Sequence, residues 1–153
     1  MKTLDQSYEE PAMNLACDEI LLNEVDSNQR EATLRFWEPQ SPFVVIGYGN
    51  NIHSECLIES CRRNNIQILR RISGGGTVLQ ARGCLNYSLI LPINDEFGTK
   101  NINSTNCHIM KTHQMAFNKA LNNGVTIEGH TDLALDGLKL SGNAQKRTKN
   151  ALV

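Results

Sequence analysis

Two long segments place apolar residues at helical spacing. The segment "PAMNLACDEILLNEVD" begins with Pro11 and carries a stripe of Met13, Ala16, Ile20, Leu21 and Val25. This spacing predicts a first helix over residues 11–26, with the proline near its start. The segment "CHIMKTHQMAFNKALNN" repeats the pattern with Ile109, Met110, Ala116, Phe117, Ala120 and Leu121. It predicts a second long amphipathic helix.

Several shorter segments are typical of strands. "TLRFWE" and "FVVIGYG" are rich in β-branched and aromatic residues and are separated by "PQSP", which predicts two strands joined by a turn. "IQIL" and "CLNYSLIL", which is closed by Pro92, predict two more. In "DLALDGLKLSG", Asp136 and Gly137 lie between two alternating runs, a strong signal for a β-hairpin.

The remaining segments predict a short helix and a loop. In "SECLIESCRRNN", Ser54 is expected to cap the helix, and Asn64 and Asn65 are expected to end it. The polar stretch from Asn94 to Thr105 is expected to form a surface loop. Helices and strands interleave without a regular βαβ rhythm, so the predicted fold class is α/β, more specifically α+β, with a mixed sheet flanked by helices. We expect a single domain over residues 1–153.

Composition and charge narrow the classes of function. Fifteen Lys and Arg against sixteen Asp and Glu give a net charge of −1, so no global field favours nucleic acid or an anionic membrane. The N-terminal segment has acids where a signal peptide would be apolar, and no run approaches the length of a membrane span. We therefore expect a cytoplasmic protein. Because the chain stops at "NALV", where an apolar run has only begun, we also expect a C-terminally truncated polypeptide.

The five cysteines are odd in number and lack CxxC spacing, so reduced thiols in or near the core are expected. Cys107, His108 and His113 lie close together in the sequence, and His53 precedes Cys56 and Cys61, so each group is a candidate for zinc. Neither group has a second half with the paired spacing of a structural zinc site. No metal site is predicted from protein ligands.

A run of three glycines, Gly74, Gly75 and Gly76, follows two arginines in "LRRISGGGTVLQARGCLNYSLI". The glycines could let a strand turn sharply, or they could let backbone N–H groups converge on an anion. The segment lacks the Gly-Lys-Ser/Thr of a P-loop and the third glycine of a dinucleotide fingerprint. Those two nucleotide motifs are therefore rejected.

Arg70 and Arg71 are adjacent on a predicted strand, so one of them should face inward. A buried guanidinium needs an anionic partner. That partner is either a protein carboxylate, such as Glu19 or Asp18, or a bound phosphate.

Lys139 lies between Leu138 and Leu140 in the predicted hairpin. In a regular strand the two leucines share one face, which leaves Lys139 on the opposite, polar or ligand-facing side. An exposed, solvated lysine is the ordinary alternative. Ser141 and Gly142 follow directly, and this small pair is typical of a site where the backbone approaches a ligand.

Together, "RRISGGGTVLQARGCLNYSLI" and "DGLKLSGNAQKR" resemble the two signature segments of the lipoate-protein ligase A family, a relative of biotin-protein ligases and octanoyltransferases. "MNLACDEILLNEV" and "LRFWEPQSPFVVIGYGNN" resemble the first helix and the strand pair of the same family. The resemblance covers nearly the whole chain. It implies the biotin/lipoate ligase type of mixed sheet, with a hydrophobic tunnel for lipoate or octanoate beneath the glycine loop.

The resemblance also implies an activity and its residues. Lipoate would react with ATP, with Mg²⁺ bridging the pyrophosphate, and a carrier lysine would then displace AMP. By match to the motif, Lys139 would be catalytic and contact the acyl carbonyl and the α-phosphate. The adenylate would be held by Arg71, Gly74, Gly75, Gly76, Thr77, Val78, Leu79 and Lys139. The substrate would be contacted by Arg70, Ser73, Gln80, Gly83, Asn86, Ser141 and Gly142.

The implied partners are lipoyl carrier domains of 2-oxoacid dehydrogenase E2 subunits or the glycine cleavage H protein. No nucleic acid or membrane is expected. The short basic run "KRTK" is typical of solvated surface, and docking of an acidic carrier is the alternative.

Three departures from the family pattern leave alternatives open. Gln80 stands where many members have His, so no acid/base role remains there. Tyr48 and Asn50 stand in "GYGN" where many ligases have Gly-Arg-x-Gln, and the family continues beyond Val153. An octanoyltransferase with a cysteine nucleophile is the nearest rival, although "GVTIEGHTDLALDG" before Lys139 has no cysteine and Cys84 is expected to be inert. A non-catalytic lipoate-binding relative is the other alternative.

Overall fold

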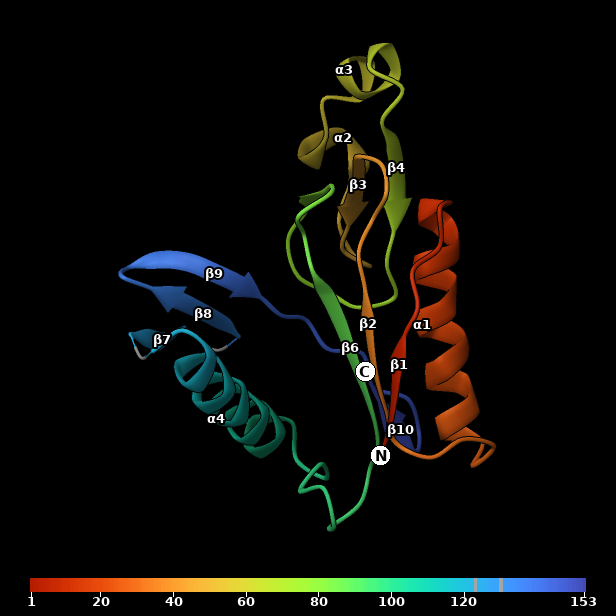
Figure 1. Cartoon of the computed structure of the whole chain (residues 1–153). Coiled ribbons are helices and arrows are strands. Elements are labelled where there is room, and N and C mark those ends of the chain that lie inside the picture. The colour runs from red at the N-terminus through yellow and green to blue at the C-terminus, as the bar shows by residue number, and fades with distance from the viewer. Residues whose placement is uncertain (123, 130) are drawn as a thin grey trace. The chain divides into compact units, whose positions relative to one another are not determined.

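A computed structural model gives the fold, and it describes residues 1–122, 124–129 and 131–153 (Figure 1). The chain forms two compact units, Met1–Pro92 with Gln145–Val153 and Ile93–Ala144. Each unit is described by itself, and the assignment of residues 1–153 to one domain stays a prediction. The mixture of helices with parallel and antiparallel strands confirms the predicted α+β class.

The first unit contains three helices and seven strands among the described residues. The helices are α1 (Pro11–Asp26), α2 (Ile52–Glu55) and α3 (Ile58–Arg63). The strands are β1 (Lys2–Asp5), β2 (Thr33–Trp37), β3 (Phe43–Ile46), β4 (Gln67–Arg70), β5 (Val78–Gln80), β6 (Asn86–Pro92) and β10 (Ala151–Leu152).

These strands form two sheets. One has the order β1-β2-β6-β10, with β1 parallel to β2 and the other pairs antiparallel. Helix α1 connects β1 to β2 and packs on this sheet, where Leu21, Leu22 and Val25 meet Ile90 and Ala151 in one core cluster (Figure 1). The other sheet has the order β4-β3-β5, with a core cluster of Trp37, Phe43 and Val45. It is the second sheet that carries the glycine segment, between β4 and β5.

The second unit is a helix packed on a three-stranded antiparallel sheet. It consists of α4 (Ile102–Ala120), β7 (Val125–Glu128), β8 (Asp132–Leu135) and β9 (Leu138–Gly142), in the sheet order β7-β8-β9. Met110 of α4, Val125 and Leu133 form its core. The predicted hairpin is confirmed, since Asp136 and Gly137 have φ of 52° and 76°, the left-handed geometry of a two-residue turn.

Several element predictions are confirmed. The first helix spans Pro11–Asp26 as expected, with proline in its first turn. Strands occupy the segments predicted from "TLRFWE", "FVVIGYG", "IQIL" and "CLNYSLIL". Asn64 is the C-cap of α3, and Asn65 follows with a φ of 53°.

Other details were wrong. Ser54 does not cap the short helix, because it lies inside α2, which Asn51 caps; α3 begins separately at Ile58. The loop expected from Asn94 to Thr105 is shorter, because Asn101 accepts bonds from the N–H groups of Asn103 and Ser104 and starts α4 at Ile102. In α1, Met13 and Ile20 of the predicted apolar stripe are exposed, and Leu22 is buried instead.

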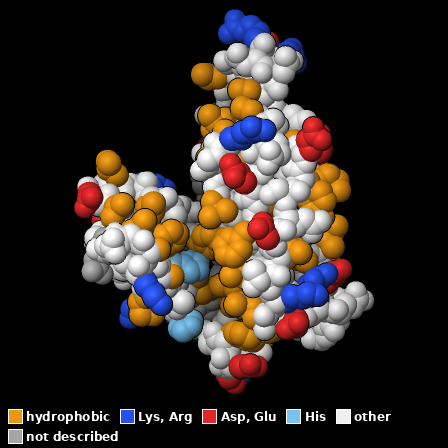
Figure 2. Space-filling model, in the orientation of Figure 1, with side chains coloured by type: hydrophobic (Ala, Val, Ile, Leu, Met, Phe, Trp, Pro, Cys, Tyr) orange, Lys and Arg blue, Asp and Glu red, His pale blue; other side chains and the backbone are white. Residues whose placement is uncertain are grey.

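The thiols and the surface agree in part with expectation. All five cysteines are free, four of them half-buried and Cys107 exposed. On the face drawn in Figure 2, acidic and basic side chains are interspersed, as a net charge of −1 suggests. In the described part of the chain, no helix has the length and hydropathy that a membrane span requires.

Candidate functional site

The glycine segment is held by the guanidinium of Arg71. Its Nε and Nη2 donate to the carbonyl of Gly74 at 3.1 and 2.5 Å, and Nη2 also donates to the carbonyl of Gly76 at 2.8 Å. The Asn50 amide donates to the carbonyl of Gly75 at 3.1 Å. Two side chains therefore bind the carbonyls of all three glycines.

This arrangement decides where the amides of the segment point. The C=O of one residue and the N–H of the next belong to one planar peptide unit and point in opposite directions. The N–H groups of Gly75, Gly76 and Thr77 are thus directed away from Arg71 and Asn50. Within the described residues, none of these three N–H groups has a backbone acceptor. Successive amides without acceptors are a ready site for an anion.

Arg71 is the inward-facing arginine of the pair. Its side chain is half-buried, and burial lowers the pKa of its guanidinium. The first of the two predicted alternatives, a carboxylate partner such as Asp18 or Glu19, is not found among the described residues: Asp18 pairs with Arg35 at 2.6 Å, and no ion pair of Arg71 is present there. Among the residues that the structure describes, the guanidinium of Arg71 bonds to the carbonyls of Gly74, Gly76 and, at 3.4 Å, Val45.

Arg70 organises the neighbouring loop, residues 47–50. Its Nη1 donates to the carbonyls of Gly47, Tyr48 and Asn50 at 2.8, 2.9 and 2.8 Å. The N–H of Tyr48 donates to the carbonyl of Ser73 at 2.9 Å. Loop 47–50 and the glycine segment therefore support each other, and Arg70 and Ser73 contribute to the scaffold of the segment.

Gly47 is the residue that sequence reasoning missed. A Cβ at this position would lie 2.1 Å from the carbonyl oxygen of Gly75, a distance no side chain tolerates. Only glycine lets the two segments touch. Gly47 is a single glycine before Tyr48 and is not part of a glycine run, so the sequence alone carries no signal for its role.

The predicted residues after the glycines are partly solvent-facing. Val78 and Leu79 are exposed, and they lie on β5 opposite Val45 and Val44 of β3. The hydroxyl of Thr77 is buried and has no hydrogen-bond partner among the described residues. A buried hydroxyl without a partner costs free energy, so it is a group that a ligand atom can satisfy.

Gln80 and Asn86 bind each other through both amides. The Gln80 amide donates to Asn86 Oδ1 at 2.9 Å, and the Asn86 amide donates to Gln80 Oε1 at 3.1 Å. Gly83 has a φ of 87°, and its N–H donates to the Glu38 carboxylate at 2.7 Å. The Gln80–Asn86 pair joins the end of β5 to the start of β6, and the Gly83–Glu38 bond joins the connecting loop to the residue after β2.

The loop residue Tyr48 has a cationic neighbour. The ammonium of Lys146 lies 5.1 Å from the centroid of the exposed Tyr48 ring, within range of a cation–π interaction. The first lysine of "KRTK" is therefore half-buried against loop 47–50 and is not a freely solvated charge.

The second group of predicted residues lies in the second unit. The Lys139 ammonium is 2.7 Å from the Asp132 carboxylate, and the lysine side chain is 63% exposed. Leu138 pairs with Leu135 and Lys139 with Ala134, so Lys139 is on the opposite face from Leu138, as expected. Leu140 departs from the regular pattern, because a bulge leaves it without a partner on β8. Ser141 and Gly142 follow in the same strand.

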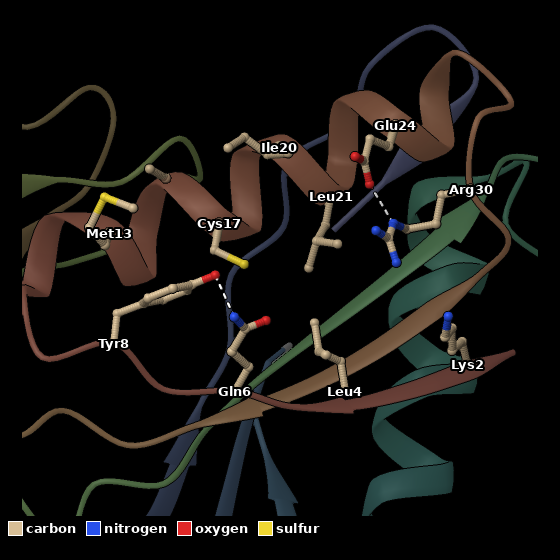
Figure 3. A pocket seen from close by; sticks show the side chains of 11 residues that line it. Lys2, Leu4, Gln6, Tyr8, Met13, Cys17, Ile20, Leu21, Glu24 and Arg30 are labelled. Atoms are coloured by element: carbon tan, nitrogen blue, oxygen red, sulfur yellow. Dashed lines mark hydrogen bonds and ion pairs between the residues drawn. The ribbon is translucent and has the colours of Figure 1, made fainter.

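The first unit also contains a cavity. A cavity of about 380 Å³ lies between α1 and β1, lined by apolar side chains such as Leu4, Cys17 and Leu21 (Figure 3). No predicted site residue lines it. Among the described residues, no group of three His, Cys, Asp or Glu side chains could hold a metal ion.

Comparison with protein families gives a match over residues 10–153 to the description "Lipoyl protein ligase A/B catalytic domain". Over 148 residues the chain is 32% identical to lipoate-protein ligase LplJ of Bacillus subtilis, covering 97% of this chain and 42% of that protein. It is also 38% identical over 101 residues to octanoyltransferase LipM of Clostridioides difficile, covering 65% of this chain and 36% of that one. The chain thus spans less than half the length of either relative.

Solved structures give the same fold. A lipoate-protein ligase A bound with ATP superposes with a TM-score of 0.83 at 24% identity, covering 99% of this chain and 63% of that one. A bipartite ligase of Thermoplasma acidophilum, reported with its E2 lipoyl domain, superposes with a TM-score of 0.81 at 21% identity, covering 99% and 58%.

Proposed function

The chain belongs to the family of lipoyl protein ligase A/B catalytic domains, and we propose that it forms the catalytic part of an ATP-dependent lipoate-protein ligase. The observation that carries the proposal is the glycine segment, whose carbonyls are bound by Arg71 and Asn50 and whose amides are left to receive an anion. The half-buried guanidinium of Arg71 holds two of these carbonyls and so keeps the amides in this orientation.

The proposed reaction has two steps. An oxygen of the lipoate or octanoate carboxylate attacks the α-phosphorus of ATP, and the bond to pyrophosphate breaks. The ε-amine of a carrier lysine then attacks the acyl carbon of the adenylate, the bond to AMP breaks, and the nitrogen loses its proton. The products are AMP and an amide.

Lys139 is the proposed catalytic residue. In the first step two anions must meet, and two unit charges about 4 Å apart repel by about 4 kcal/mol at an effective dielectric of 20. An ammonium contacting both the acyl carbonyl and the α-phosphate converts this repulsion into attraction. Lysine suits this role because its compact charge can donate to two oxygens.

The glycine segment is proposed to hold the phosphate of the adenylate. Backbone amides that are already oriented need no rearrangement as charge develops. The buried Thr77 hydroxyl offers one further donor. Gly74, Val78 and Leu79 shape the backbone of the segment, and Arg70 and Ser73 support it through loop 47–50. Gln80, Gly83 and Asn86 are proposed to contact the substrate. Ser141 and Gly142 are proposed to approach the substrate beside Lys139.

Mg²⁺ and the carrier follow from the chemistry and the family. Mg²⁺ prefers phosphate oxygens and water over a dedicated protein cage, so the proposal assigns it to the pyrophosphate of ATP. The proposed partners are lipoyl carrier domains of 2-oxoacid dehydrogenase E2 subunits or the H protein. The archaeal ligase reported with its E2 lipoyl domain supports the E2 partner only. A cytoplasmic location is proposed from the same reaction, since ATP is consumed.

The second candidate is an octanoyltransferase, which the similarity to LipM favours. That reaction needs a cysteine thioester and no ATP. Burial and nearby negative charge raise the pKa of the Cys56 thiol, and a raised pKa disfavours the thiolate, so Cys56 is a poor nucleophile.

One experiment separates the two. The full-length protein is incubated with apo carrier domain and either lipoate, ATP and Mg²⁺ or octanoyl carrier protein alone, and the product is read by mass spectrometry. We predict ATP-dependent lipoylation, which Lys139→Ala reduces at least about a hundredfold, as expected on removal of a group that stabilises the transition state. ATP-independent transfer from the octanoyl carrier, or wild-type rates in Lys139→Ala, would contradict the proposal.

A further inference from the structure

The bulge in β9 brings two residues to one face of the hairpin that a regular strand would separate. Residues three apart in a strand point to opposite sides. In β9, Lys139 pairs with Ala134 and Ser141 pairs with Leu133, so Leu140 is the extra residue. The extra residue changes the alternation, and Lys139 and Gly142 therefore face the same side.

Asp132 lies on that side as well. It pairs with Gly142 across the ladder, and directly opposed residues of an antiparallel pair share a face. Its carboxylate accepts a hydrogen bond from the Lys139 ammonium at 2.7 Å. Apolar Leu133, which alternates with Asp132, points instead into the core against α4.

The lysine side chain reaches this carboxylate by lying along Gly142. A Cβ on Gly142 would be 3.2 Å from both Cε and Nζ of Lys139, closer than side chains normally approach. The φ angle of Gly142 is not positive, unlike that of several other glycines in the chain. Space for the lysine, rather than backbone conformation, is thus what glycine supplies here.

We propose that Asp132 is a positioning residue for Lys139, holding its ammonium over Gly142 on the polar face of the hairpin. The inference rests on the proposed catalytic role of Lys139. A free lysine side chain samples many rotamers, and restricting them before the substrate arrives removes an entropic cost from the reaction. The bulge places Lys139 on this face, Asp132 binds its ammonium, and Gly142 leaves room for its side chain.

The hairpin sheet offers a matched control. Glu128 lies directly opposite Asp132 on β7 and so shares its face. Its carboxylate accepts a bond from Thr126 at 3.4 Å, and it has no ion pair with Lys139 among the described residues. Glu128→Gln therefore removes a neighbouring charge without removing the contact.

The first measurement reads the ammonium directly. Trace acetylation with acetic anhydride is quantified by mass spectrometry at Lys139, relative to exposed Lys119 on α4 as an internal standard. We expect Asp132→Asn to raise labelling of Lys139 by about twofold to fivefold, the range an exposed ion pair gives. Gly142→Ala should do the same, Asp132→Glu should return labelling toward wild type, and Glu128→Gln should leave it unchanged. Equal labelling in Asp132→Asn and Glu128→Gln would overturn the inference.

The second measurement reads turnover in the full-length protein by ATP–pyrophosphate exchange. Asp132→Asn should lower kcat about tenfold while KM for ATP and lipoate stays within about twofold, because positioning, not binding, is lost. If Lys139→Ala retains wild-type exchange, the proposed function fails. If Lys139→Ala is inactive but Asp132→Asn matches Glu128→Gln in labelling and in kcat, the positioning role alone fails.

Discussion

The two arginines that precede the glycine segment hold backbone loops in place, because their guanidinium groups donate to backbone carbonyls. Arg70 binds three carbonyls of loop 47–50, and Arg71 binds two carbonyls of the glycine segment. The sequence predicted that one of them faces inward, which Arg71 confirms, but it suggested an anion for the guanidinium. Carbonyl partners are invisible in a sequence because every residue has a carbonyl, and only the chain path brings these to the arginines.

Gly47 gives the prediction at this scale. In Gly47→Ala the new methyl group would meet the Gly75 carbonyl at 2.1 Å, so loop 47–50 and the glycine segment must separate. We expect a loss of about 1–3 kcal/mol in the free energy of unfolding, as for overpacking, measured by urea denaturation. Gly49→Ala is the control, since a Cβ there meets nothing within 4 Å. It should change stability by less than about 0.5 kcal/mol, and equal losses in both variants would contradict the account.

At the scale of elements, periodic segments were the most predictable. The bounds of helix α1 were predicted to the residue from Pro11 at its start and the helical spacing of apolar residues, although Met13 and Ile20 of that stripe are exposed. The faces were less predictable. In β2 the buried positions are Thr33, Arg35 and Trp37, while Leu34 is only half-buried. Hydrophobicity alone would place Leu34 inside and Arg35 outside, which is the wrong face. Arg35 can be buried because residues 6, 14 and 18, distant in sequence, accept its hydrogen bonds.

The contact between α1 and β2 depends on that buried charge. Arg35 is 0% exposed, and its guanidinium donates to carbonyls of Gln6 and Asn14 and to the carboxylate of Asp18. Burial raises the pKa of Asp18, while the neighbouring Arg35 and hydrogen bonds oppose that rise. The pair therefore joins the two elements at a cost in desolvation.

A pH dependence follows with a definite sign. Because the pKa of Asp18 is raised above 3.8 in the folded protein, the native state binds its proton more tightly than the unfolded chain does. The stability linked to that proton is fully present below 3.8 and is lost as pH rises through the folded pKa.

The difference in unfolding free energy between wild type and Asp18→Asn should therefore fall from about pH 3 upward and level off above the folded pKa. Urea denaturation across this range measures it. A difference that rises with pH would mean that attraction to Arg35 outweighs burial.

At the scale of the whole molecule, the class of fold followed from the sequence and the strand pairing did not. Four strands, β1, β5, β7 and β10, were not predicted, since segments of two to four residues carry too little alternation. Nor could adjacency in sequence reveal that β2 and β3 belong to different sheets. The candidate site residues were predicted from two signature segments, because three successive glycines and a lysine between leucines each suggest contact with a ligand, and their roles stay a prediction. Asp132 and Gly47 were missed because their importance comes from a bulge and from a close approach.

The central claim is that the amides of Gly75, Gly76 and Thr77 receive the anion of an acyl adenylate. Its most direct test is a ¹H–¹⁵N NMR titration of the protein with lipoyl-adenylate, following the backbone amides. We predict saturable shifts at these three amides, and their loss in Arg71→Ala, whose glycine carbonyls are no longer held. Saturable binding that leaves the three amides unmoved, or no binding by the folded protein, would contradict the claim.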